Sequence, residues 1–339
     1  MTTMPGFHTG AGEIRSSGIV VGRQAGVAAA DVAHSADWRN RLPLEFDHEV
    51  YVNHAGNKDI ARLGETAARL HYKNHGMAEG RICSEVQGRK QFIGLVPAAL
   101  PILEIGPFFS PAFRRPEANV SYLDCLSAKA MKERAAKLKG AAIENIPEID
   151  YVWSGQRYAE LIGRKFMAIY SSHNIEHQPC LLTHLHDIES VLEKEGAVFF
   201  AVPDKRYCFD HFFPETNLAD IVEAWAEGKN RHRLKDILEH RFFAAHNEPA
   251  RHWRGDHGTN RGLLQLDDRQ NVSFMAELER LRSSTEYTDV HAWKFTPATF
   301  KTLFDDLFSL RLTRLRIARL YQTVKNSNEF YAVLVFGRK

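Results

Sequence analysis

The strongest constraint on the fold is an alternation of short apolar runs with helical patterns in the middle of the chain. Brief apolar runs separated by helix-length segments are typical of parallel strands joined by crossover helices. The sequence therefore predicts an α/β protein built on a Rossmann-like, mostly parallel sheet with helices on both faces. The expected strands are ILEIG at 102–106, VSYLD at 120–124, DYVWS at 150–154, FMAIYSS at 166–172 and AVFFAVP at 197–203.

Two helices and two further strands are expected in addition to these five strands. Pro179 suits the first turn of an amphipathic helix between the last two strands above, and Gly196 can end it. Thr296 is suited as the N-cap of a second helix, because a proline follows it at the first helical position. Closing strands are expected at about 310–320 and 329–337, which brings the sheet to seven strands.

The rest of the chain has a different pattern before and after this core. Residues up to about 40 are rich in Gly, Ala and Ser, so they bury too little surface to offset the entropy of ordering them. A helix is expected over 56–75, where Ile60, Leu63, Ala67 and Leu70 recur at helical spacing. The expected parts are a flexible leader at 1–40, a helical N-terminal extension at 41–100, the Rossmann-like core at 101–205, an insertion or cap at 206–290, and the C-terminal completion of the sheet at 291–339.

The amino-acid composition limits the kinds of molecule that this chain is expected to bind and the compartment in which it is expected to work. The chain has 44 Lys and Arg against 42 Asp and Glu, and a net charge of +2 is too small to attract a nucleic acid. The four cysteines are far apart and form no CxxC pair, as expected of reduced thiols in the cytoplasm. No apolar run approaches the roughly 20 residues of a membrane helix. We therefore expect a cytoplasmic protein with a small-molecule partner and no membrane or nucleic-acid contact, and the oligomeric state stays open.

Candidate ligand contacts follow the first two predicted strands. Ligands of open α/β sheets bind outside the carboxyl ends of the strands. Gly106 would let the backbone approach a ligand closely, and Glu104 could meet an ammonium group. Asp124 ends the second strand eighteen residues after Gly106, a distance suited to hydrogen-bonding a ribose diol. Together these residues predict a nucleoside site.

The order of the motifs ILEIGP, YLD, SSHNIEH and EKEGAVFFAVPDKRY resembles the class I S-adenosylmethionine-dependent methyltransferases of the type 11 kind. The resemblance covers about 102–207 and implies an S-adenosylmethionine-binding core that the antiparallel strand pair of 310–339 completes. The chain departs from the usual GxGxG loop, since only Gly106 is present. The cofactor contacts that the resemblance implies are Glu104, Gly106, Pro107, Asp124, Cys125, Leu126, Ser154, Gly155, Ser172 and His173.

Such an enzyme would methylate an oxygen or nitrogen of a small-molecule or glycan acceptor, and the acceptor must lose a proton. His173 and His177 are the candidate general bases, because an imidazole accepts a proton near neutral pH. His177 could instead cap the helix that follows it. A divalent metal at His173, Glu176 and His177 is an alternative, and we assign no metal ligand from the sequence. The spacing HxxEH also occurs in zinc peptidases, but there both histidines lie on one helix, whereas His173 ends a predicted strand.

Two other classes of function compete with this interpretation. A nicotinamide-dependent oxidoreductase would use the same fold, but it requires a GxGxxG motif after the first strand, which the sequence lacks. A non-catalytic binding module is the second alternative, because the cofactor loop is poor in glycine and the insertion is long. Cofactor binding and methyl transfer separate the three classes.

Overall fold

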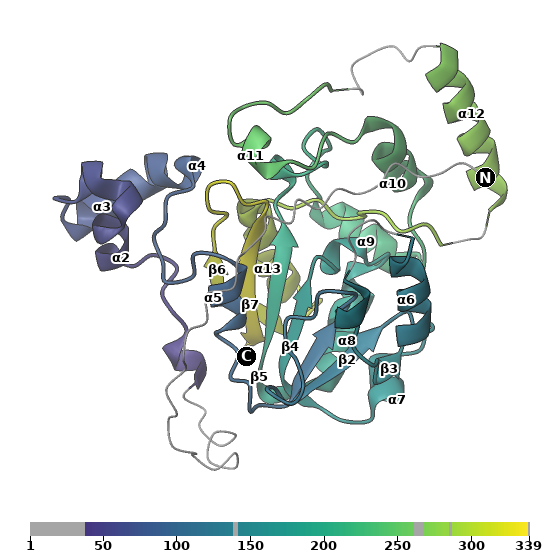
Figure 1. The fold of residues 1–339 in the computed structure, drawn as a ribbon, viewed down its shortest axis with the longest axis horizontal. Helices are drawn as coiled ribbons and strands as arrows, with labels where there is room; N and C mark the ends of the chain where they lie inside the picture. Colours follow the sequence, from purple (N-terminus) through teal and green to yellow (C-terminus); the bar gives the residue numbers. More distant parts are fainter. Residues whose placement is uncertain (1–37, 138–141, 261–267, 285–286, 338–339) are drawn as a thin grey trace.

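The computed structural model describes residues 38–137, 142–260, 268–284 and 287–337, so most of the leader expected at 1–40 lies outside it. Seven strands form one sheet in the order β3-β2-β1-β4-β5-β7-β6 (Figure 1). Strands β1 to β5 run parallel, and β7 pairs antiparallel with both β5 and β6. The predicted Rossmann-like sheet with an antiparallel closing pair is confirmed. The strands are β1 (Ile102–Ile105), β2 (Val120–Asp124), β3 (Tyr151–Val152), β4 (Phe166–Ser172), β5 (Leu192–Pro203), β6 (Leu315–Tyr321) and β7 (Glu329–Phe336).

Helices and short helical turns connect the strands. The α-helices are α2 (His48–Asn53), α3 (Glu65–His71), α4 (Met77–Glu79), α5 (Arg89–Ile93), α6 (Ala128–Ala135), α7 (Tyr158–Ile162), α8 (Leu181–Val191), α9 (Leu218–Ala226), α10 (Leu234–Leu238), α11 (Pro249–His252), α12 (Asp268–Ser283) and α13 (Pro297–Ser309). The 3₁₀-helices are η1 (Trp38–Arg41), η2 (Ala55–Ile60), η4 (Ile143–Asn145), η5 (Ile175–His177) and η6 (Lys205–Tyr207). The π-helices are η3 (Tyr72–Gly76) and η7 (Glu239–Phe243).

The two faces of the sheet are covered differently. One face packs against α7, α8, α9 and α13, whose apolar side chains join those of the strands in the largest core cluster. The other face packs against η1, α5 and the segments around them, with Phe92 and Phe199 at the centre of a second cluster. Because both faces are covered, β1, β7 and the part of β5 from Gly196 onward are buried along nearly their whole length and consist mostly of apolar residues.

Helix α13 follows its sequence signals, and α8 departs from them at its end. Thr296 caps α13 with a reciprocal capping box, as predicted. Helix α8 ends at Val191 and β5 begins at Leu192, so the prediction that Gly196 ends this helix is wrong. Gly196 lies inside β5, where a Cβ would come within 2.9 Å of the Glu193 carbonyl oxygen and 3.0 Å of the Met167 carbonyl oxygen. The glycine is needed for close backbone packing beside the register shift between β4 and β5.

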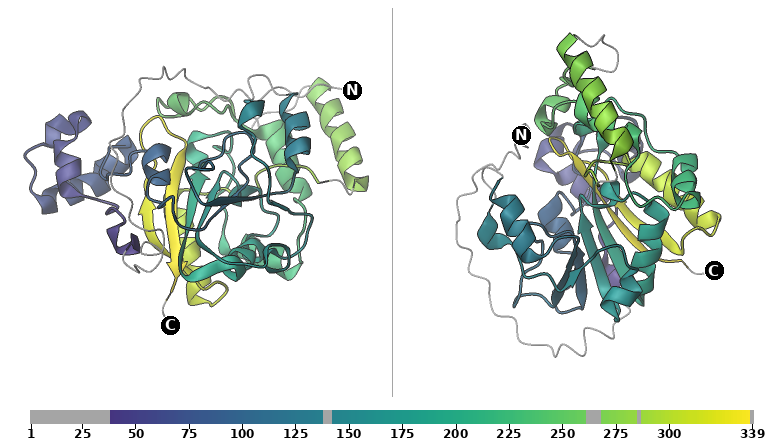
Figure 2. Two further views of the ribbon diagram at one scale, coloured as in Figure 1. Left: turned by 60° about the horizontal axis from the view of Figure 1, so that its bottom comes forward. Right: turned by 90° about the vertical axis from the view of Figure 1, so that its right-hand side faces the viewer.

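The N-terminal extension forms a small helical lobe beside the sheet (Figures 1 and 2). The single helix predicted at 56–75 is wrong, because η2 and α3 are separate and Asn57 has a non-helical backbone inside η2. Ala68 is buried in the lobe's own core, whereas Leu70 is 58% exposed. Ala67 and Leu70, expected on the buried side, therefore face away from that core. The reason is that α3 begins anew at Glu65, so its residues do not continue the helical periodicity of Ile60 and Leu63.

The insertion expected at 206–290 occupies two places. Helix α9 packs beside α8 and α13 on one face of the sheet. Helices α10, α11 and α12 lie beyond the carboxyl ends of the central strands (Figures 1 and 2). The extended segment before α13 returns along the end of β4, where the amide of Ala292 donates a hydrogen bond to the carbonyl of Glu176 at 2.7 Å.

Candidate functional site

A cavity of about 350 Å³ lies between the loop after β1 and the carboxyl end of β4. The strand order reverses direction beside β1, whose two neighbours are β2 and β4. Ligands of open α/β sheets bind outside the strand ends at such a switch point. The cavity is lined by Arg89, Ile93, Glu104, Gly106, Pro107, Phe108, Phe109, Ser110, Pro111, Ala112, Tyr170, Ser172 and His173.

Gly106 makes the turn that opens this cavity. Its φ of +71° lies in the left-handed region that favours glycine. A Cβ at this position would lie 3.0 Å from the side-chain nitrogen of Asn174 in the loop after β4. Both the backbone conformation and the close packing of the two loops therefore require a glycine here.

Glu104 holds the loop after β1 in place. Its carboxylate accepts hydrogen bonds from the amides of Ala112 at 2.7 Å and Phe113 at 3.1 Å. Burial raises the pKa of Glu104 to about 7, against the opposing effect of these two hydrogen bonds. The sequence interpretation placed this side chain near a ligand ammonium group and did not foresee its contacts with the loop. Glu104 does line the cavity, so it supports the loop from the cavity wall.

The raised pKa of Glu104 predicts a pH-dependent stability. Between about pH 4.5 and 7 the folded chain holds a proton on Glu104 that the unfolded chain has lost, so the free energy of unfolding should fall as pH rises through this window. The slope from this group is at most about 1.4 kcal/mol per pH unit. Urea denaturation from pH 5 to 8 should show this decline in the wild type relative to Glu104→Gln. Parallel curves for the two proteins would contradict the prediction.

Asp124 ends β2 as predicted and shapes the turn after it. Its Oδ1 accepts a hydrogen bond from the amide of Leu126 at 3.0 Å, and burial raises the pKa of the carboxyl. Leu126 packs in the same apolar cluster as Phe108 and Phe109. The loops after β1 and β2 are therefore joined by aromatic and aliphatic contacts beside the carboxylate.

The predicted cofactor residues fall into two groups. Ser172, His173, Glu104, Gly106 and Pro107 all line the cavity. The lining does not include Asp124, Cys125, Leu126, Ser154 or Gly155, which follow β2 and β3. Strand β3 has only two residues, against the five predicted. Ser154 and Gly155 are exposed and lie in a turn, where the amide of Ser154 donates a hydrogen bond to the side-chain oxygen of Gln156.

His173 is fixed at the edge of the cavity by a buried acid. It has a φ of +48°, and its Nε2 lies 2.9 Å from a carboxylate oxygen of Glu329 on β7. Glu329 also pairs with Arg89 of α5 and accepts a hydrogen bond from the hydroxyl of Tyr331 at 2.7 Å. Burial opposes the charge on Glu329, but His173 and Arg89 hold its pKa well below the usual range. His173 is thus a positioned imidazole that borders the cavity.

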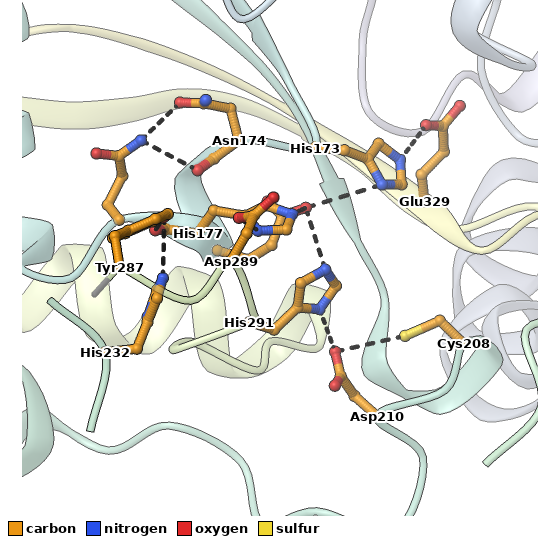
Figure 3. Close-up of polar contacts among 12 residues, drawn as sticks. His173, Asn174, His177, Cys208, Asp210, His232, Tyr287, Asp289, His291 and Glu329 are labelled. Carbon is orange, nitrogen blue, oxygen red and sulfur yellow. Dashed lines mark hydrogen bonds and ion pairs between the residues drawn. The ribbon is translucent and has the colours of Figure 1, made fainter. Parts of the chain in front are cut away.

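His177 lies outside the lining of the cavity, and its side chain is 27% exposed. Its Nδ1 is 2.9 Å from Asp289, in the segment that leads to α13 (Figure 3). Burial acts against the charged imidazole, but the hydrogen bond to Asp289 and the negative charges of Glu176, Asp289 and Asp210 together raise the pKa of His177. The prediction that His177 caps or orients the following helix has no support in the geometry, because its side chain bonds to Asp289. Of the two candidate bases, His173 is therefore the one beside the cavity.

Sequence reasoning missed the residues that join distant segments around this site. Arg89, Tyr170 and Glu329 were not foreseen at the cavity, nor were Asp210, Asp289 and His291 around His177. Glu329 lies 240 residues from Arg89, so no local periodicity could pair them. The local sequence offered only Asp289 and His291, which lie a few residues before the Thr296 cap.

Comparison with known proteins gives matches to solved structures at low sequence identity and low TM-score. No family model matches the chain, and no curated protein sequence matches it significantly. The glycopeptide N-methyltransferase MtfA with sinefungin is 16% identical, with a TM-score of 0.24, over 32% of this chain and 49% of its own. The CcbJ methyltransferase from Streptomyces caelestis is 10% identical, with a TM-score of 0.37, over 74% of this chain and 88% of its own. A Rhodobacter sphaeroides protein described as a zinc-dependent alcohol dehydrogenase is 10% identical, with a TM-score of 0.35, over 70% and 84%. Activity must therefore be argued from the sheet and the cavity.

No helix in the described part of the chain combines the length and the apolar character needed to cross a membrane.

Proposed function

We propose that this chain binds S-adenosylmethionine and transfers its methyl group to a small-molecule or glycan acceptor. The observation that carries the proposal is the cavity at the switch point between β1 and β4, opened by Gly106, in a sheet closed by an antiparallel strand pair. This is the arrangement that the resemblance to class I methyltransferases implies. Asp124 at the end of β2 supports the proposal, since it ends the strand next to β1 and could take the ribose hydroxyls.

The polar groups of the cavity fit such a ligand. Tyr170 and Ser172 line it, and their buried hydroxyls make no hydrogen bond of ordinary geometry within the residues that the structure describes. Buried hydroxyls without partners are costly, so a polar ligand that bonds them would be stabilised. Glu104 adds a carboxyl that a ligand ammonium group would draw into its charged form.

A nicotinamide dinucleotide fits less well. The dinucleotide sites of this fold hold a pyrophosphate at the N-terminus of the helix that follows the first strand. Here residues 106–119, all described, contain no helix between β1 and β2. S-adenosylmethionine has no phosphate and therefore needs no such helix terminus, which favours it over NAD.

The chain's own groups would act mainly by positioning. S-adenosylmethionine, when bound, supplies an electrophilic methyl group on a sulfonium centre. The loops after β1 and β4 would hold the ligand, exclude water and align the acceptor with it. His173 borders the cavity and is oriented by Glu329, so we propose that it accepts the acceptor's proton. The acceptor would enter from the side of 206–290, where α10 to α12 stand beyond the strand ends (Figure 1).

Calorimetry with S-adenosylmethionine, its demethylated product and NAD tests this proposal. We expect the first two to bind, and Asp124→Ala to weaken their binding by about 1.5–3 kcal/mol, or about 10- to 150-fold, through loss of charged hydrogen bonds to the ribose. Asp306→Ala, which removes an exposed acid on α13, should leave the affinity unchanged.

Binding of NAD, with no binding of S-adenosylmethionine or of its demethylated product, would overturn the proposal. Unchanged affinity in Asp124→Ala would show that this carboxylate serves only the turn at Leu126. A methyl-transfer screen over small-molecule and glycan acceptors then separates an enzyme from a protein that binds the cofactor without turnover.

A further inference from the structure

Glu176 is a buried carboxylate whose two oxygens accept no hydrogen bond from any group that the structure describes. The residue is 0% exposed. One of its oxygens, Oε1, lies 3.8 Å from each of three ring nitrogens, on His173, His177 and His291. Figure 3 shows these imidazoles, two from the connection between β4 and α8 and one from the segment before α13. A distance of 3.8 Å is too long for a hydrogen bond, and a buried carboxylate without a partner is costly. The arrangement therefore calls for a group in the space between these atoms.

The geometry of two of these imidazoles suits a metal ion. The Nδ1 of His177 lies 2.9 Å from Asp289, and the Nδ1 of His291 lies 2.5 Å from Asp210. Each ring then donates its Nδ1–H to a carboxylate and keeps a lone pair on Nε2, the nitrogen that faces Glu176. A histidine that binds a metal usually donates its other ring N–H to a carboxylate in this way. The outer acids thus set both tautomers for coordination.

The distances also suit a common ion. The ligand atoms of Glu176, His177 and His291 all lie within 4.8 Å of one another. Nitrogen and oxygen atoms that share a zinc ion at about 2.0–2.2 Å stand roughly 3.0–3.4 Å apart at tetrahedral or octahedral angles. A contraction of a few tenths of an ångström would bring the 3.8 Å contacts into that range. The two imidazole nitrogens would also have to approach each other to that spacing, so ion binding at this site includes a local movement of the side chains.

We propose that Glu176, His177 and His291 bind a divalent transition metal ion, with zinc as the preferred occupant. Two imidazoles and a carboxylate suit zinc and leave a coordination position open for a water or a substrate oxygen. His177 is then a metal ligand, which leaves His173 as the base beside the cavity. Metal binding as such does not depend on the proposed methyl transfer. If both hold, an ion at the end of β4 would polarise an acceptor hydroxyl and so select acceptors with an oxygen donor.

A second group of histidines provides an internal comparison. His211, His252 and His257 also lie close enough to share an ion. No carboxylate belongs to this group, and the Nδ1 atoms of His252 and His257 already contact each other at 3.1 Å. A metal there would have to displace the proton between these two nitrogens, whereas the Glu176 oxygens have no hydrogen bond to lose. The Glu176 group is therefore expected to bind zinc more tightly.

Competition titration of the chelator-treated full chain with zinc tests the proposal, with cobalt absorption as a spectroscopic readout of coordination. We expect one tight site in the wild type. Glu176→Gln and His291→Gln should weaken it by at least about 100-fold, and Asp210→Asn by about 10- to 100-fold. His252→Gln is the matched control and should leave the tight site unchanged. Equal zinc affinity in the wild type and Glu176→Gln, or loss of the tight site in His252→Gln alone, would overturn the proposal.

Thermal unfolding of the metal-free proteins guards against a folding artefact. Glu176→Gln removes an unpartnered buried charge, so its metal-free form should melt no lower than the metal-free wild type. Added zinc should raise the melting temperature of the wild type and not that of the variant. A variant that melts lower without metal would show that protonated histidines hold Glu176 in place of an ion. S-adenosylmethionine binding is measured separately, so failure of the cofactor proposal would leave these results unaffected.

Discussion

Replacement of Trp293 by alanine is expected to lower the free energy of unfolding by about 3–5 kcal/mol, the usual cost of removing a large buried aromatic side chain. Trp293 is buried in the largest core cluster. Its indole N–H also donates to the carbonyl of Gln178 at 2.6 Å. The variant would therefore lose apolar burial and the hydrogen bond to the half-buried Gln178 carbonyl.

The variant should also affect the site, because Trp293 fastens the segment that carries His291 to the turn that carries Glu176. The amide of Ala292 beside it donates to the Glu176 carbonyl at 2.7 Å. Urea denaturation gives the stability loss. Trp293→Phe keeps most of the buried ring but lacks the N–H, so a smaller loss of about 1–2 kcal/mol is expected.

Trp225→Ala is the matched control, since Trp225 is 42% exposed on α9. Its replacement should change the free energy of unfolding by no more than about 0.5–1 kcal/mol. Equal losses in the two alanine variants would show that Trp293 does not anchor the core as the contacts indicate.

Replacement of Glu329 by alanine is the second large effect, with an expected loss of about 3–4 kcal/mol. Removing one member of a buried ion pair leaves its partner's charge uncompensated. Glu329 is 7% exposed and contacts Arg89, His173 and Tyr331. The Arg89 side chain is 44% exposed, so water would relieve part of the penalty, which keeps the expected loss below the upper end for buried pairs.

The same carboxylate predicts a loss of stability in acid. The pKa of Glu329 is lower in the folded chain than in the unfolded chain, because burial is outweighed by the contacts with His173 and Arg89. The folded chain therefore binds fewer protons below about pH 4.5, and this contribution to stability is lost as pH falls toward the folded pKa. Glu329→Gln should remove that acid dependence while it keeps an acceptor for Tyr331.

Denaturation of the wild type, Glu329→Ala and Glu329→Gln at pH 4 and pH 7 measures both effects. The difference between the wild type and Glu329→Gln should be smaller at pH 4 than at pH 7. An unchanged difference would mean that the carboxylate is not held ionised by Arg89 and His173.

The sequence by itself determined the class of fold and much of its order. Parallel strands buried on both faces must be short and apolar, so ILEI and FMAIYSS stand out without any knowledge of their partners. The cap at Thr296 was predictable because a capping box lies within four residues. Gly106 and Asp124 were found for a similar reason, since a strand end is a local feature. A local signal can also mislead. Gly196 was expected to end a helix, but it lies inside β5, where close backbone contacts leave no room for a side chain.

Only the tertiary structure decided which of these residues work together. The turn at Glu176 meets His291, 115 positions later, because the segment before α13 returns along the end of β4. Glu329 reaches Arg89 and His173 because β7 inserts next to β5 and its first residue lies beside the carboxyl ends of the parallel strands. Side-chain periodicity reports only whether a residue faces a core, whereas contact between distant side chains depends on strand order and register. The sequence already grouped Glu176 with His173 and His177, whereas the approach of His291 to this carboxylate becomes visible only when the sheet is assembled.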